Sequence, residues 1–197
     1  MHIYKRFVVL IVLGLLTISG VVADPSPQKD NDLNTFPHAI SDGKPLPIRG
    51  SRMCKEGFYA DLYLTVDPLR FCQQWASVPS SGTPNMAGTT THLVKRNMPV
   101  SFLVLIANPK LDNSSNADVS YTINIKKPDG KMELPQDTWL WKGKYLAPPK
   151  GCVLCGMNVI RYAVDDTAPS GRYSVEAIVK DNNRQVELPL QSFFIVD

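Results

Sequence analysis

Apolar and polar side chains alternate along several short segments of the chain from residue 58 onward. Between Phe58 and Val66 every second residue is aliphatic or aromatic, and the same period of two returns in 119–126 and 173–179. Because successive side chains of a strand point to opposite faces, this period predicts strands with one buried face. The run from Val100 to Ala107 is interrupted only by Ser101, which predicts a central strand that is buried on both faces.

Shorter β-prone pieces at 89–94, 157–164, 186–190 and 193–196 complete the pattern, with turn-forming Pro, Gly, Asn and Asp residues between them. A short helical turn is predicted within 69–75, and the aromatic-rich segment 139–149 is expected to be irregular. No segment after residue 23 shows a sustained period of 3.6, which disfavours a helix bundle or a βαβ architecture. The spacing predicts an all-β, antiparallel sandwich of about seven strands.

The N-terminus has the pattern of a secretory signal peptide. Lys5 and Arg6 precede a largely apolar run from Phe7 to Ile18, and Val21 and Ala23 occupy the small-residue positions of a cleavage site. The run to Val22 is shorter than the roughly 20 residues of a spanning helix, so we expect cleavage after Ala23 rather than a retained membrane anchor. The expected product is exported to the periplasm or the extracellular space.

Three segments follow from this interpretation: a signal peptide at 1–23, a flexible Pro-rich leader at 24–49 and one β-sandwich domain at 50–197. Removing Lys5 and Arg6 leaves 19 basic residues of the original 21 against 18 acidic ones. A net charge of +1 gives no reason to expect binding to nucleic acid or to anionic lipid.

The four cysteines, Cys54, Cys72, Cys152 and Cys155, all lie after the expected cleavage site, and an exported chain with an even number normally pairs them. A straight strand over 58–66 spans roughly 26 Å and separates Cys54 from Cys72. We therefore expect each of these two to bond one of Cys152 and Cys155. The pairing of Cys54 with Cys72 and of Cys152 with Cys155 stays open as an alternative, as does a redox or metal-binding role for the cysteines.

The segment Asp166-Thr167-Ala168-Pro169-Ser170-Gly171-Arg172-Tyr173-Ser174-Val175 resembles the entry to the penultimate strand of immunoglobulin-like sandwiches. The final segment 193–197 is similar to the end of bacterial immunoglobulin-like and macroglobulin-type domains. The resemblance implies that Tyr173 is a corner residue whose hydroxyl bonds back to the preceding connection, which Gly171 allows to approach closely. Val175 stands where antibody-type domains have a cysteine, so their inter-sheet disulfide is not expected.

Trp139, Trp141 and Tyr145 form a possible binding surface, although core filling explains large aromatics in a sandwich equally well. Asp165 and Asp181 have a calcium-binding alternative but fit turn chemistry better. His92 lacks a G-x-S-x-G nucleophile motif beside it, which disfavours a hydrolase. Asn113 begins an N-glycosylation sequon that matters only in a host that glycosylates exported proteins.

These features favour a non-catalytic binding or scaffolding domain that has no cofactor or metal and binds a protein partner of unknown identity. A proteinase inhibitor is the first alternative, with a rigid loop at 78–88 or 142–155 as its contact segment. A metal-binding or redox protein that uses the cysteines is the second.

Overall fold

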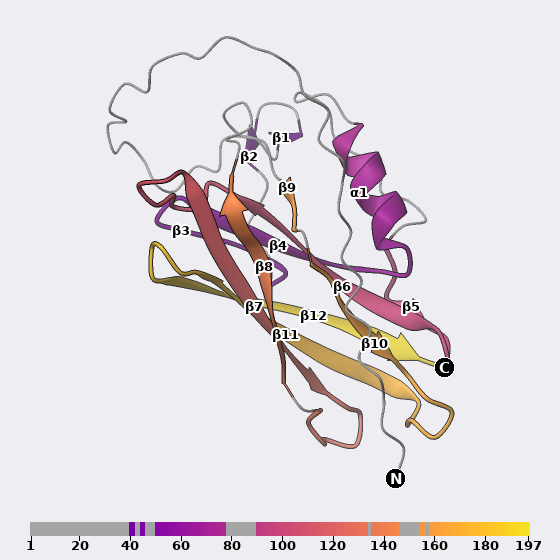
Figure 1. The fold of residues 1–197 in the computed structure, drawn as a ribbon. Helices are drawn as coiled ribbons and strands as arrows, with labels where there is room; N and C mark the ends of the chain where they lie inside the picture. The colour runs from indigo at the N-terminus through magenta and orange to yellow at the C-terminus, as the bar shows by residue number, and fades with distance from the viewer. Residues whose placement is uncertain are drawn as a thin grey trace.

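The computed structural model describes residues 40–41, 44–45, 50–77, 90–133, 135–145, 154–156 and 158–197. These ranges form one helix and two five-stranded sheets that face each other (Figure 1). The signal-peptide prediction lies outside the described residues. Within the predicted leader, β1 (Ile40–Ser41) and β2 (Lys44–Pro45) form a small antiparallel ladder, and the rest of the leader up to residue 49 also lies outside them.

The first sheet has the strand order β10-β6-β4-β3, and β9 also pairs with β6. Its strands are β3 (Arg52–Lys55), β4 (Phe58–Thr65), β6 (Pro99–Ala107), β9 (Leu154–Cys155) and β10 (Ile160–Ala163). The two short strands share β6, because β10 pairs with residues 99–102 and β9 with residues 105–106. The ladder alongside β6 is therefore interrupted between them.

The second sheet has the order β5-β12-β11-β7-β8. Its strands are β5 (Leu93–Val94), β7 (Asn116–Lys126), β8 (Gln136–Lys144), β11 (Gly171–Asp181) and β12 (Val186–Val196). All neighbours are antiparallel except β5, which runs parallel to β12 at Ile195 and Val196. The alternation predicted for 119–126 and 173–179 therefore belongs to two adjacent strands, β7 and β11.

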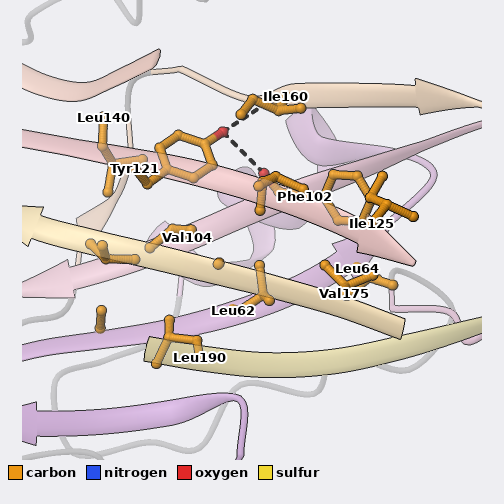
Figure 2. Close-up of a cluster of buried hydrophobic side chains, with 14 of the residues drawn as sticks. Leu62, Leu64, Phe102, Val104, Tyr121, Ile125, Leu140, Ile160, Val175 and Leu190 are labelled. Atoms are coloured by element: carbon orange, nitrogen blue, oxygen red, sulfur yellow. Dashed lines mark hydrogen bonds between the residues drawn. The ribbon is translucent and has the colours of Figure 1, made fainter. Parts of the chain in front are cut away.

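The core lies between the inner faces of the two sheets. Figure 2 shows Leu62, Phe102 and Val104 of the first sheet with Tyr121 and Val175 of the second. The Tyr121 hydroxyl accepts a hydrogen bond from the N–H of Ile160 at 2.8 Å, and the Phe102 carbonyl oxygen lies 3.3 Å from it. Tyr121 thus fixes the second sheet to the first near the break between β9 and β10.

The prediction that 58–66 has one buried face is wrong, because both faces of β4 are buried. The helix α1 (Pro68–Ala76) lies over the outer face of β4 and β6, where Phe71 joins Leu103 and Leu105 in a second apolar cluster. Asp67 caps this helix by accepting the N–H of Arg70 at 3.0 Å, and Pro68 occupies its first turn. The short helical turn predicted at 69–75 is therefore a capped nine-residue helix.

The segment around Trp139, predicted to be irregular, is the edge strand β8. A bulge opposite Val119 and Ser120 interrupts its alternation, which is why the sequence pattern did not indicate a strand. The pieces predicted at 186–190 and 193–196 form the single strand β12, and β3 was not predicted. Eight strands of four or more residues occur in the described part of the chain, against the seven or so expected.

Candidate functional site

The outer face of the second sheet carries an open groove of about 450 Å³. Three adjacent strands contribute to it: β7 with Asn124 and Lys126, β11 with Arg172 and Glu176, and β12 with Gln191 and Phe193. The register explains this assembly, since Ser174 lies between Lys126 and Phe193 on one rung and Glu176 lies between Asn124 and Gln191 on the next. Residues far apart in the sequence thus form one surface, which we call the β11 groove.

Phe193 is the centre of a stack beside this groove. The guanidinium carbon of Arg172 lies 4.0 Å from the centroid of the Phe193 ring, and the His92 ring stacks on the same phenyl ring at 4.8 Å with an interplanar angle of 20°. The Nδ1 atom of His92 also lies 2.8 Å from the Phe193 carbonyl oxygen. A cation over an aromatic face is stabilised by about 0.5–1 kcal/mol at an exposed site, so the stack orients the Arg172 side chain.

Two cationic residues, Lys126 and Arg172, and three apolar ones make up half of the ten residues that line the β11 groove. Within the described ranges no carboxylate forms an ion pair with Lys126 or Arg172, and Glu176 is the acidic residue in the groove lining. Met132, in the lining, is 59 % exposed, and Leu93, which pairs with Ile195 of β12, is 63 % exposed. Arg, Met and aromatic side chains are enriched in protein–protein interfaces, so this composition suits recognition of a protein.

A second polar cluster lies on the outer face of the first sheet. Arg52 forms an ion pair with Asp61 at 2.5 Å, and Asp61 is 2 % exposed. The Tyr59 hydroxyl donates to the same carboxylate at 3.2 Å, and Arg52 donates to the Tyr63 hydroxyl at 3.2 Å. Burial raises the pKa of the Asp61 carboxyl against the opposing charge of Arg52. Because Asp61 is enclosed, a substrate cannot reach it, and the cluster is structural.

Two cysteines meet beside this cluster. Cys72, on α1, and Cys155, on β9, pack against the same apolar cluster, and the neighbouring Cys155 thiol lowers the pKa of Cys72. The neighbouring Cys72 thiol, together with burial, raises the pKa of Cys155. Cys54 lies on β3 opposite Tyr59, and burial raises the pKa of its thiol. No sulfur–sulfur bond joins these three described cysteines, and Cys152 lies outside the described residues.

The structure separates the three aromatic residues of the predicted binding surface. Tyr145 is 6 % exposed and belongs to the core, and the Trp141 ring packs against it edge-on at 5.1 Å. The bulge in β8 places Trp141 opposite the buried Val119 but Trp139 opposite Ser120, on the outer face. Two of the three aromatic residues therefore serve mainly as core packing, and Trp139 alone is left on the outer face.

Gly171 and Tyr173 form the corner that the resemblance implies. The Tyr173 hydroxyl donates to the carbonyl oxygen of Pro169 at 2.9 Å, and its buried ring stacks on Phe194 at 4.8 Å. Gly171 has φ +126°, and a Cβ atom at this position would lie 3.2 Å from the Pro128 side chain. The positive φ and the close approach both explain why glycine occupies the position.

The remaining candidates have local explanations. Asp165 accepts the N–H of Thr167 at 2.9 Å, and Asp181 accepts the N–H groups of Lys110 and Arg184, so both acids stabilise turns. Among the described residues no three His, Cys, Asp or Glu side chains are grouped as metal ligands would be. Asn113 is exposed on a turn. The loop 78–88 lies outside the described residues, and of 142–155 only the two ends are described.

None of the helices in the described ranges is both long and apolar enough to cross a membrane. No family model and no curated protein sequence matches the chain.

Solved structures show only a distant likeness. A CARDB domain from Pyrococcus furiosus, in complex with di-metal ions, is 16 % identical, with 54 % of this chain and 81 % of that chain covered and a TM-score of 0.31. A family 123 glycoside hydrolase from Clostridium perfringens is 8 % identical over 70 % of this chain and 27 % of that one, with a TM-score of 0.38. The C-terminal domain of wzt is 14 % identical over 70 % and 73 %, with a TM-score of 0.33. Likenesses at this level carry no argument about function.

Proposed function

We propose that the protein is an exported, non-catalytic immunoglobulin-like domain that binds another protein through the β11 groove. The immunoglobulin-like assignment is supported by strand order. The first sheet matches the A, B and E strands of an immunoglobulin-like sandwich, with β4, β6 and β10 in that order along the chain. The second sheet matches C, C′, F and G, with β7, β8, β11 and β12. The Tyr173 corner, at the start of the strand in the F position, supports the same assignment.

The stack of Arg172 on Phe193 is the observation that carries the binding role. It presents a cation that has no ion-pair partner in the described ranges, on an aromatic surface bordered by exposed Met132. Arginine and aromatic side chains are the residues that most often dominate binding energy at interfaces. The groove chemistry therefore suits a protein segment that carries a carboxylate next to apolar side chains.

A site-specific photo-cross-linking experiment on the full chain tests this proposal. A photoreactive phenylalanine analogue at Gln191, in the groove, is compared with the same analogue at Glu187, which is exposed on the same strand but outside the groove lining. Irradiation in the producing cells is expected to give a discrete protein adduct from position 191 and none from position 187. The variant Arg172→Glu should abolish the adduct, and Lys180→Glu, a charge reversal on β11 outside the groove lining, should preserve it.

The proposal is overturned if both positions give the same adducts, if Arg172→Glu leaves the yield unchanged, or if no protein adduct forms. A thermal midpoint of Arg172→Glu that stays well above the temperature of the experiment shows that any loss comes from the surface and not from unfolding.

A further inference from the structure

The helix α1 is the one described element outside the two sheets and the β1–β2 ladder, and it covers a face that carries a buried ion pair. Its residues Phe71, Cys72 and Trp75 pack on the outer face of the first sheet. The Phe71 and Trp75 rings lie 5.1 and 6.2 Å from the ring of Tyr63, the residue that accepts a hydrogen bond from Arg52. The helix α1 therefore packs next to this polar cluster, through the ring of Tyr63.

Cys155 contributes to the same outer face of the first sheet, from the strand β9. It lies on β9, where it pairs with Leu105, and Leu105 belongs to the cluster that contains Phe71. The Cys72 and Cys155 side chains both pack against this cluster, and each thiol shifts the pKa of the other. A helix and a strand that are far apart in the sequence thus each place one cysteine on the same apolar cluster.

Cys54 is too far from Cys155 to compete for it. The path from β3 through β4 and β6 to β9 crosses three strand spacings, about 14 Å at about 4.8 Å each. Bonded cysteines need Cα atoms within about 7 Å. A Cys54–Cys155 bond would therefore require the sheet to come apart.

We propose that Cys72 and Cys155 form a disulfide that fixes α1 to the first sheet. In the reaction the two thiols lose two protons and two electrons, and a disulfide oxidant such as oxidised glutathione takes up the electrons and becomes two thiols. The reaction passes through a mixed disulfide, which the second thiolate then displaces. The proposal does not depend on the β11 groove, which lies on the other sheet.

The closeness of the two cysteines on this cluster favours the first step of this exchange. The neighbouring Cys155 thiol lowers the pKa of Cys72, and the thiolate is the species that attacks a disulfide. A cross-link between distant parts of a chain also restricts the unfolded state more than a short one does.

Peptide mapping of the full chain tests the pairing. The protein is equilibrated with reduced and oxidised glutathione, remaining thiols are blocked with iodoacetamide, and the chain is cleaved with trypsin. Cys72 then lies in peptide 71–95, Cys54 in peptide 53–55, and both Cys152 and Cys155 in peptide 151–161. We expect 71–95 to be joined to 151–161, with fragmentation of the linked species placing the bond at Cys155.

Two variants provide a second readout. The variant that combines Cys54→Ser with Cys152→Ser keeps only the proposed pair, and a reductant should lower its thermal midpoint. Adding Cys155→Ser should remove that response. A blocked Cys72 in the oxidised wild-type protein, a link from 71–95 to 53–55, a bond placed at Cys152, or a midpoint of the double variant that does not respond to reductant would each overturn the proposal.

Discussion

Replacing Tyr121 by phenylalanine removes one hydroxyl from the centre of the sandwich. That oxygen accepts the Ile160 N–H at 2.8 Å and lies 3.3 Å from the Phe102 carbonyl oxygen (Figure 2). It also lies 3.4 Å from the carbonyl oxygen of Asn158. The phenyl ring fills almost the same volume, so no sizeable cavity forms, but the buried N–H of Ile160 loses its partner. An unsatisfied buried donor costs about 1–3 kcal/mol, so we expect Tyr121→Phe to lower the free energy of unfolding by about 2 kcal/mol.

Urea denaturation of the full chain, followed by tryptophan fluorescence, measures this change. The midpoint should fall with no change in slope, and a loss of about 2 kcal/mol corresponds to about 4–8 °C in melting temperature for a chain of this size. Tyr162→Phe is the matched control, since its hydroxyl donates to Glu133 at 3.0 Å, and that carboxylate is 31 % exposed and keeps Lys127 as a partner. If Tyr121→Phe costs no more than the control, the hydroxyl does not hold the two sheets together as argued.

Two further predictions concern packing and pH. At Gly156 a Cβ atom would lie 2.1 Å from Leu140 Cδ1 and 3.0 Å from the Val104 carbonyl oxygen, so Gly156→Ala should destabilise by about 1–3 kcal/mol in the same urea assay. Combining it with Leu140→Ala should cost less than the sum of the two single changes, and strict additivity would contradict the predicted clash. The pKa values of Asp112 and Asp165 are lowered mainly by hydrogen bonds, from Asn116 and from Thr167, so the stability they contribute is present above about pH 4 and lost as the pH falls through their folded values. Melting temperatures between pH 5 and pH 2 should therefore decline less for Asp165→Asn than for the wild-type protein, and parallel curves would show that Asp165 plays no part.

The long strands could be predicted because their side chains alternate between the core and the outer face, which leaves a period of two in the sequence. β6, β7 and β11 all follow the expected segments for this reason. β4 shows the limit of that reasoning, since its outward residues Tyr59 and Asp61 are as buried as its inward ones. On that face Tyr59 shares a cluster with Phe71 of α1, and the alternation within β4 cannot show that a helix will pack there.

The β11 groove was missed for a related reason. Alternation assigns Arg172 and Phe193 to the outer faces of their strands, but only the register places them side by side with Lys126 from β7. The sequence of β8 also predicts the wrong arrangement for Trp139 and Trp141. Residues two positions apart in a regular strand point to the same face, so the two rings were expected on one surface. The bulge breaks that rule and sends Trp141 inward while Trp139 stays outside.

The outer faces of the two sheets differ in whether another described element packs on them, and this difference supports the proposed binding site. On the outer face of the first sheet, Phe71 and Trp75 of α1 pack beside Tyr63, and the buried ion pair of Arg52 and Asp61 lies on the same face. Burial of a carboxylate is tolerated only while its partners stay in place, so this face cannot be uncovered without cost. The outer face of the second sheet has no such cover among the described elements, and its side chains on β11 and β12 meet solvent. A partner can therefore dock on Arg172 without displacing any part of the described fold, whereas docking on the part of β4 and β6 beneath α1 would require α1 to move.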